Sequence, residues 1–379
     1  MIRQIQQFDI IIVGGGLAGL TSAIHLSHFK KSVLLIEKNE YPKHKVCGEY
    51  ISNEVLPYLK SLGIDPIQLG AKEIKEIEIS TVKSNQIKSK LPLGGFGTSR
   101  YFLDAFLFKK AKQKGAISVK EDVININFQD NIFTVKTKEN KEYRSKIVVG
   151  AFGKRSSLDI KMNRRFIQKK SPYLAVKIHV EGKFKEDLVG LHNFKGGYCG
   201  VSKVENGAIN LCYITDFKAF QQYKNIEEFQ EQVVFKNKHL KKIFKSTTPL
   251  FEKPLTISQI SFETKKPVEN HIIMCGDTAG MIHPLCGNGM GMAIRSAQIA
   301  SEKIIQYLDG KIKSRALLEK SYIRDWNKEF KMRLRTGHLV AKLFRQQRLS
   351  EITLSLLRMF PKLLPYIIKR THGKPLKGI

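Results

Sequence analysis

The chain has 379 residues, 42% hydrophobic and 26% charged, a composition typical of a globular protein with two domains or with one domain that carries an insertion. Lysine and arginine outnumber aspartate and glutamate by 65 to 34, and the net charge of +31 fits a nucleic-acid-binding protein, a protein on an anionic membrane, or a lysine-rich surface that is merely solvated. The lysines are scattered, and no helix-turn-helix, aromatic-bearing sheet or dense basic stripe is visible, so the sequence argues against nucleic-acid binding.

The first elements form a β-α-β unit. FDIIIVGGG (8–16) is an apolar, β-branched run that ends in glycine, which is typical of a buried parallel strand. Residues 17–29 have apolar side chains at helical spacing, and SVLLIEK (32–38) predicts a second buried strand. The pattern then predicts a helix over 53–62, an antiparallel pair within 73–91, a helix over 101–114, and strands over 118–128, 132–137 and 146–150.

The second half of the chain begins with strands and ends with helices. From 173 to 217 the pattern is entirely β, and ENG (205–207) is typical of a hairpin turn. Then come helices within 226–244, a last buried strand in HIIMCGD (271–277), a long helix from about residue 288, and a basic helical segment from residue 315.

A glycine-rich turn, GGGLAG (14–19), joins the first strand to the first helix. Gly14 allows the tight turn, Gly16 lets a pyrophosphate approach the backbone, and Gly19 lets the helix pack closely on the strand. The first turn of the helix, which includes Ala18, offers free N–H groups and the positive end of its dipole to phosphates. Glu37 ends the second strand, 23 residues after Gly14, where a carboxylate can accept hydrogen bonds from both ribose hydroxyls. This combination predicts a dinucleotide site.

GDTAGMIHPLCGNGMGMA (276–293) decides which dinucleotide is expected. Glu37 would repel a 2′-phosphate, so FAD or NAD fits better than NADP. In FAD-binding folds a second strand followed by Gly-Asp returns near the C-terminus, and its Asp holds the ribityl chain; Gly276 and Asp277 match that pattern. After Pro284, glycines let a helix start against the flavin ring, with its dipole toward the edge where negative charge gathers on reduction. We therefore expect FAD.

These motifs resemble the flavoprotein family of aromatic-ring hydroxylases (p-hydroxybenzoate hydroxylase-like), flavin-dependent halogenases and geranylgeranyl reductases. The match is closest to the reductase branch and covers roughly residues 8–310. It is carried by VGGGLAG with Glu37, KVCGEYIS (45–52), SRYFLDAFL (99–107), GAFGKRSS (150–157), GGYCGVSKVENGAINLCY (196–213) and GDTAGMIHPLCGNGMGMA.

The resemblance implies roles for further residues. Arg100 would reach the FAD phosphates or ribityl chain, Val123 would meet adenine through its backbone, and Gly289 and Met290 would donate N–H groups to the isoalloxazine. Arg100 also fits an ordinary arginine at the start of a helix, so the sequence leaves both interpretations open.

Catalytic residues are not identified by the sequence, which offers two weak candidates. Cys47-Gly48 corresponds to a segment that lies beside flavin and substrate in the reductase branch, and nearby cations could lower the pKa of a reactive thiol; the alternative is a small buried residue that lines the FAD site. His283 falls in the flavin-facing loop and could donate a proton, although a loop histidine is more often structural. No His or Cys pair has the spacing of a metal site.

Three departures from the family pattern limit what can be transferred. Phe152 stands where aromatic-ring hydroxylases have an Asp that helps to bind pyridine nucleotide, which argues against direct use of NAD(P)H and leaves NAD(P)H and a reduced carrier protein both open as the electron donor. Trp326 is the single tryptophan and lies outside the central sheet, which argues against halogenation. Tyr198 and Cys199 replace an aromatic-rich strand of the isoprenoid reductases, so substrate identity cannot be transferred.

The predicted fold class is α/β, with a Rossmann-type FAD-binding domain interleaved with a mostly antiparallel β substrate domain and a helical C-terminus. The expected FAD-binding parts are 1–72, 98–160 and 268–312, the expected substrate-binding parts are 73–97 and 161–267, and 313–379 is the basic helical region. The sequence does not predict an oligomeric state.

Five cysteines without paired spacing argue against a disulfide framework, and the N-terminus has no signal-peptide pattern, so a cytoplasmic protein is expected. Residues 341–379 mix aliphatic side chains with Lys and Arg, and Glu351 is their only acid. This segment could lie on an anionic membrane or form a helical lid over the substrate cavity, and the two are compatible.

The predicted function is that of an FAD-dependent oxidoreductase with a lipophilic prenyl or alkyl-aromatic substrate. The chemistry would be hydroxylation through a flavin hydroperoxide or reduction of a C=C bond. The alternatives are a flavin-dependent halogenase and a non-catalytic FAD-binding redox protein.

Overall fold

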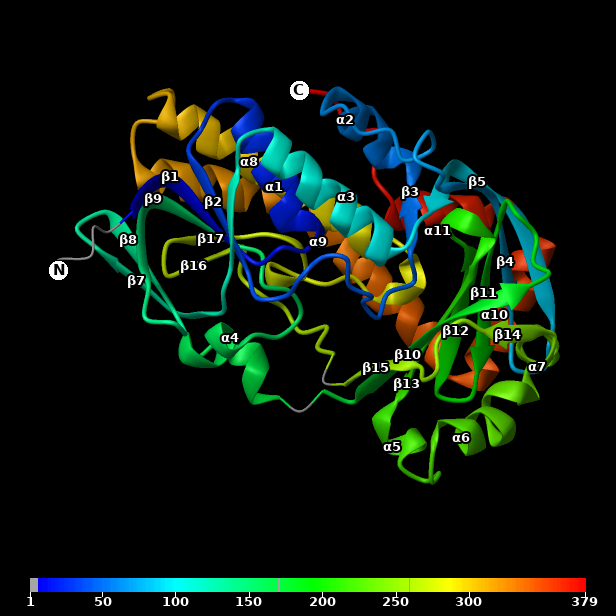
Figure 1. Ribbon diagram of the computed structural model, residues 1–379. Coiled ribbons are helices and arrows are strands. Elements are labelled where there is room, and N and C mark those ends of the chain that lie inside the picture. The colour runs from blue at the N-terminus through cyan, green and yellow to red at the C-terminus, as the bar shows by residue number, and fades with distance from the viewer. Residues whose placement is uncertain (1–5, 170, 259) are drawn as a thin grey trace.

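The computed structural model describes residues 6–169, 171–258 and 260–379. Two β-sheets lie at opposite ends of an elongated molecule, and long helices cover and connect them (Figure 1). The predicted mixed α/β architecture with a helical C-terminus is confirmed.

The first sheet carries the β-α-β unit. Its strand order is β16-β17-β9-β1-β2-β6. The bounds are β1 Gln6–Val13, β2 Val33–Glu37, β6 Ile117–Lys120, β9 Glu142–Gly150, β16 Val268–Glu269 and β17 Ile272–Met274. Strand β1 lies between β2 and β9 and is parallel to both, with Ile10 opposite Val33 and Ile147. The central stretches of these strands, 10–13, 33–36 and 147–150, are buried, which explains the short continuous apolar runs seen in the sequence.

The single strand expected over 118–128 is wrong, because the chain forms two strands there. β6 ends at Lys120 on the edge of β2, and β7 (Val123–Gln129) turns away to pair with β8 (Ile132–Thr137). Glu121 marks the break: it is buried and accepts hydrogen bonds from Lys141 Nζ at 2.7 Å and Tyr143 Oη at 3.1 Å. A buried side-chain network of this kind is not visible in strand periodicity.

The second sheet is mostly antiparallel, in the order β14-β10-β13-β12-β11-β4-β5-β3, with β15 also paired to β10. The bounds are β3 Tyr50–Ser52, β4 Lys72–Ser80, β5 Gln86–Gly97, β10 Tyr173–Gly182, β11 Leu188–Phe194, β12 Gly197–Lys203, β13 Ile209–Asp216, β14 Thr247–Pro249 and β15 Leu255–Ser258. The predicted hairpin at ENG is confirmed, since Asn206 adopts φ 59° between the antiparallel strands β12 and β13.

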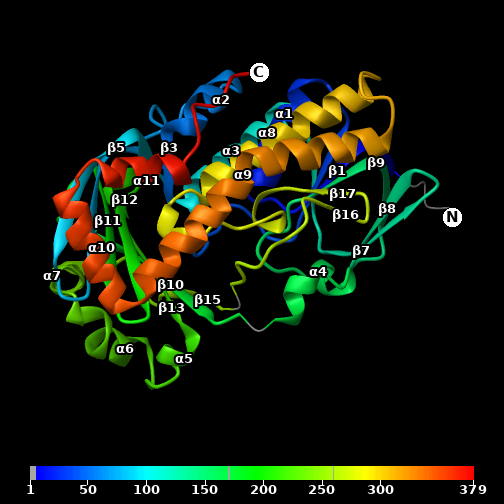
Figure 2. The same ribbon diagram turned by 180° about the vertical axis from the view of Figure 1, so that it is seen from behind.

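Helices pack on both sheets. α1 (Leu17–His28) contacts α3 (Arg100–Gln113) and α8 (Gly289–Leu308) beside the first sheet. Shorter helices are α2 Leu56–Ser61, α4 Ser157–Lys161, α5 Phe217–Phe220, α6 Ile226–Gln232 and α7 Lys238–Lys245. α9 (Arg315–Arg345) runs from the first sheet to the second, and α10 (Gln347–Met359) and α11 (Leu363–Thr371) cover the second sheet (Figure 2).

The last residues return to the α2 region. Leu376 N donates to Glu54 O at 2.8 Å, and Ile379 N donates to Ser61 Oγ at 3.0 Å. The C-terminal helices are therefore held at both ends. Within the described residues, no helix is long and apolar enough to cross a membrane.

Candidate active site

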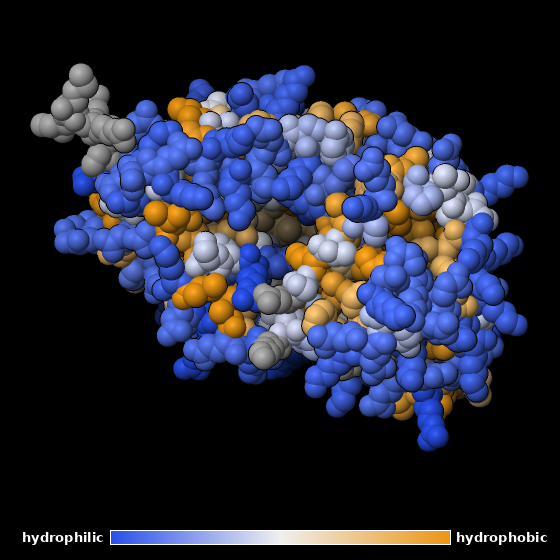
Figure 3. Space-filling model, turned by 60° about the horizontal axis from the view of Figure 1, so that its bottom comes forward, coloured by the Kyte–Doolittle hydropathy of each residue, from blue (hydrophilic) through white to orange (hydrophobic). Residues whose placement is uncertain are grey.

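A cavity of about 820 Å³ lies between the two sheets, and a recess between the two halves is visible on the surface (Figure 3). One end, here called the nucleotide end, is lined by the GGGLAG turn, the end of β2 and the start of α8. The other end, here called the apolar end, is lined by the second sheet and α9–α11. Residues from both halves of the chain therefore share one space.

The glycines of the nucleotide end divide into two groups. A methyl group on Gly14 would lie 2.4 Å from Ala151 O, and one on Gly19 would lie 1.9 Å from Gly14 O, so both are required by protein packing. At Gly16 the nearest atom to such a methyl is Arg100 Nη2 at 3.8 Å, and at Gly48 and Gly289 nothing lies within 4 Å. The second group leaves open backbone toward the cavity, as a bound dinucleotide requires.

Glu37 is held in the orientation expected of a ribose acceptor. Its Oε2 accepts from Gly15 N at 2.6 Å and its Oε1 from Asn39 N at 2.9 Å, while it still lines the cavity. Each carboxylate oxygen can accept more than one hydrogen bond, so hydroxyl groups of a ligand can still bind. Tyr41, which the sequence did not reveal, supports this corner by donating to Gly15 O at 2.5 Å.

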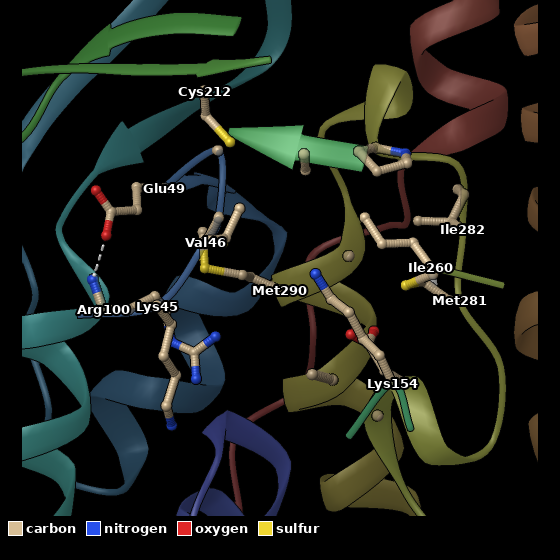
Figure 4. A pocket seen from close by; sticks show the side chains of 18 of the residues that line it. Lys45, Val46, Glu49, Arg100, Lys154, Cys212, Ile260, Met281, Ile282 and Met290 are labelled. Carbon is tan, nitrogen blue, oxygen red and sulfur yellow. Dashed lines mark hydrogen bonds between the residues drawn. The ribbon is translucent and has the colours of Figure 1, made fainter. Parts of the chain in front are cut away.

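Arg100 begins α3, which is capped by Ser99, and its guanidinium lies in the cavity wall (Figure 4). It forms a bidentate pair with Asp104, at 2.7 Å from both Nε and Nη2, and Lys45 Nζ reaches the same carboxylate at 2.8 Å. Burial opposes ionisation of Asp104, but the two cations hold its pKa below the ordinary value. The sequence missed this i, i+4 acid, although its spacing from Arg100 was visible.

The remaining predicted cofactor residues also line the cavity. Val123 starts β7, Gly276 and Asp277 follow β17, and Gly289 and Met290 begin α8. The turn that holds Asp277 is anchored through its neighbour Thr278, whose carbonyl accepts from the buried Arg164 at 3.0 Å. The residues predicted for cofactor binding thus line one cavity, except Gly19, which packs against Gly14 and Ala151 instead; their individual roles stay predictions.

A buried ionic cluster lies directly behind Cys47-Gly48. Glu49 accepts from Lys177 Nζ at 2.5 Å, bonds His179 Nε2 at 2.6 Å and accepts from Arg100 N at 2.7 Å. Burial alone would raise the pKa of Glu49, but His179 and Lys177 lower it below the ordinary value. The cluster joins the Cys47 loop to β10 and α3, and it was not predicted, because its members are distant in sequence.

The two candidate catalytic residues are separated. Cys47 lines the cavity, and its carbonyl accepts from Asn210 Nδ2 at 3.1 Å. His283 instead lines a neighbouring chamber of about 470 Å³, with its ring 4.7 Å from that of Phe262. No group of His, Cys, Asp or Glu in the described chain could hold a metal ion.

The apolar end is built from side chains of many elements. Its walls combine Ile77 and Ile79 of β4, Leu91 of β5, Val189 and Leu191 of β11, Val340 and Phe344 of α9, Leu357 of α10, and Leu364, Ile367 and Ile368 of α11. Of the two interpretations of the C-terminal segment, the lid is the one that the structure displays, since α9–α11 close this end of the cavity.

A sequence model of the family described as "FAD binding domain" matches residues 7–325. The chain belongs to this family. Digeranylgeranylglycerophospholipid reductase 1 of Methanothermobacter thermautotrophicus is 24% identical over 80% of this chain and 78% of its own. Conditioned medium factor receptor 1 of Dictyostelium discoideum is 22% identical over 79% of this chain, which spans 63% of that protein. The flavin-dependent brominase Bmp2, at 17% identity, matches 97% of this chain and 93% of its own with a TM-score of 0.78, and it shows the shared fold.

The predicted family, cofactor and enzyme class are confirmed: the protein is an FAD-dependent oxidoreductase that acts on a small molecule. The open glycine backbone and the oriented Glu37 carboxylate fit FAD.

Proposed function

We propose that this oxidoreductase acts on a lipophilic substrate, a prenyl or alkyl-aromatic compound, by hydroxylation or by reduction of a C=C bond. The observation that supports this most is the apolar end of the cavity, which is continuous with the nucleotide end and lined by aliphatic side chains from the second sheet and α9–α11. The reductase relative, whose name describes a prenyl lipid substrate, agrees with it.

We assign the cofactor contacts as the sequence predicted them. Gly16 and the helix start at Ala18 would approach the pyrophosphate, while Gly14 allows the tight turn and Gly19 the close helix packing that place them. Glu37 would bind the ribose, Val123 the adenine, Arg100 the phosphates or ribityl chain, and Asp277 the ribityl chain. Gly289 and Met290 would donate N–H groups to the isoalloxazine, with Cys47, Gly48 and Gly276 beside the cofactor. When bound, FAD supplies hydride or electron transfer, with NAD(P)H or a reduced carrier protein as donor. The chain's own part is to orient the two ligands and to exclude water.

The domain division expected from the sequence is also our proposal: 1–72, 98–160 and 268–312 bind FAD, 73–97 and 161–267 contact the substrate, and 313–379 covers it. A halogenase is disfavoured because the single tryptophan, Trp326, belongs to α9 and not to the second sheet. Its ring packs against Gly280, where an added methyl would lie 3.0 Å from it.

The test compares adjacent leucines of α10. Leu357 is 3% exposed and lines the cavity, whereas Leu356 is 48% exposed and does not line it. Leu357→Trp should fill the apolar end and weaken binding of 4-nonylphenol to the FAD-loaded protein at least tenfold, while Leu356→Trp should leave it unchanged. Binding is read from the absorption of the bound flavin. Val189→Phe blocks the same space from β11 and serves if Leu357→Trp does not fold. Unchanged affinity in both blocking variants would refute the lipophilic pocket.

We also propose that the C-terminal region contacts a membrane peripherally. Apolar side chains are exposed on the outer face of α10 and α11, namely Ile352, Leu356, Met359, Phe360, Leu363 and Tyr366. Exposed cations flank them: Arg348, Arg358, Lys362, Lys369 and Arg370. Apolar insertion combined with attraction to anionic headgroups is how an amphipathic helix binds a bilayer surface. Because the inner face of the same helices closes the cavity, a lipid could enter from the bilayer.

A further inference from the structure

Lys154 carries a positive charge inside the cavity and belongs to none of the residues predicted from the sequence. Lys154 follows β9 after the short segment Ala151-Phe152-Gly153, and its half-buried side chain lines the cavity. Its amino group points into the cavity between Met290 on one side and Ile260 and Met281 on the other (Figure 4).

The backbone of Lys154 is fixed. Gly153 has φ +86°, which turns the chain, and its N–H donates to Thr278 Oγ1 at 2.8 Å. The Lys154 carbonyl accepts from the buried Lys265 Nζ at 3.3 Å. The main chain is therefore tied to the Asp277 turn, while the lysine side chain extends away from these contacts into the cavity.

Three cations in or directly behind the wall of the cavity have carboxylate partners. Arg100 and Lys45 share Asp104, and Lys177 pairs with Glu49. No ion pair joins Lys154 to any acid in the described part of the chain, where pairing means an N–O distance of 4.0 Å or less.

The surroundings of the Lys154 amino group favour an anion brought by a ligand. Ile260, Met281 and Met290 are apolar, and their side chains offer no charged acceptor, only the weakly accepting thioether sulfurs of the two methionines. Its charge reaches across the cavity to Cys212 of β13: burial raises the pKa of that thiol to about 12, and Lys154 is among the cations that oppose the rise. An ammonium in an apolar wall is costly unless a counter-charge accompanies it.

We propose that Lys154 binds an anionic oxygen of the substrate, so that the lipophile carries a carboxylate, phosphate or phenolate next to the nucleotide end. This inference rests on the proposed lipophilic substrate and makes it more specific. The aliphatic tail would occupy the apolar end, and the charged group would remain beside Met290, where the two halves of the cavity meet.

The experiment uses the FAD-loaded protein and two probes with the same ten-carbon chain, decanoate and 1-decanol, titrated by calorimetry. The wild type should bind decanoate at least tenfold more tightly than decanol. Lys154→Met should lose that preference without changing decanol affinity, and Lys154→Arg should retain it. Lys161→Met removes an exposed lysine on α4 and should change neither probe.

The outcomes separate the two levels of the proposal. Equal wild-type affinity for both probes, or an unchanged preference in Lys154→Met, overturns the role of Lys154 and leaves the lipophilic pocket intact. A Lys154→Met variant with a shifted flavin potential but unchanged decanoate affinity would assign the charge to the reduced cofactor and also overturn the inference. Failure to bind either probe would refute the lipophilic substrate itself.

Discussion

The two ends of the cavity are built in different ways. At the nucleotide end the backbone approaches the ligand space: Gly16, Gly48 and Gly289 leave it open, and a few side chains such as Glu37 are oriented by main-chain N–H groups. At the apolar end the wall is not built from a backbone motif. It consists mainly of individual aliphatic side chains from β4, β5, β11 and α9–α11. One end depends on chain geometry and the other on side-chain volume.

This difference explains how the two ends tolerate change. A backbone site cannot accept an added methyl group without losing its ligand, whereas a wall of aliphatic side chains can be reshaped one residue at a time. We therefore expect cofactor binding to be sensitive to single glycine substitutions and substrate choice to be adjustable in α9–α11.

The pH dependence of the free energy of unfolding should show whether the two regions unfold as one unit. It is the largest effect that we expect. His25 of α1 donates to or accepts from Tyr58 Oη at 2.7 Å, and His192 of β11 bonds Ser80 Oγ at 2.8 Å. Burial lowers the pKa of His25 to about 4 and that of His192 to about 3. Below pH 6.5 the unfolded chain binds more protons than the folded protein. The free energy of unfolding should therefore be independent of these histidines above pH 6.5 and fall by about 3 kcal/mol per histidine as the pH drops to 4.

The measurement is the free energy of unfolding in urea at pH 7 and at pH 4 to 6.5. His25→Gln and His192→Gln should each make the pH dependence shallower to a similar extent. If the regions are one cooperative unit, both histidines act on a single transition. Two transitions, each sensitive to one histidine, would show that the sheets unfold separately.

A matched pair of glycines should separate packing from ligand approach. Gly19→Ala places a methyl 1.9 Å from Gly14 O and should cost about 2 kcal/mol of stability in the FAD-free protein. The methyl of Gly289→Ala meets no atom within 4 Å, so the free energy of unfolding of this FAD-free variant should lie within about 0.5 kcal/mol of the wild-type value. FAD affinity should nevertheless fall at least tenfold. Wild-type FAD affinity in Gly289→Ala would contradict the placement of the cofactor.

The smallest effect on the fold is expected on the outer face of α10 and α11. Met359 and Leu363 are 70% and 43% exposed, so changing both to Glu should alter stability by less than about 1 kcal/mol and leave FAD binding intact. Co-sedimentation with vesicles that contain anionic lipid should drop several-fold. Leu317→Glu, at an equally exposed site at the start of α9, is the control. Equal sedimentation of all variants would disprove this membrane surface.

The sequence predicted the nucleotide end far better than the apolar end, for a physical reason. A glycine turn between a strand and a helix and an acid at the next strand end are local patterns with few other uses, so Gly14, Gly19 and Glu37 could be placed in advance. The Glu49–Lys177–His179 cluster and the break at Glu121 depend on contacts between distant segments. Leu357 and Leu356 are adjacent leucines of one helix, and only the fold shows which faces the cavity. The lid was foreseen as one of two alternatives.

The central claim is that one continuous cavity holds FAD at one end and an aliphatic chain at the other. A titration of the FAD-loaded protein with 4-alkylphenols, from phenol to 4-nonylphenol, tests it most directly through the absorption of the bound flavin. Burial of each methylene contributes about 0.8 kcal/mol, so affinity should rise about fourfold per added carbon until the tail fills the apolar end. An affinity that does not depend on chain length, with the flavin still bound, would contradict the account.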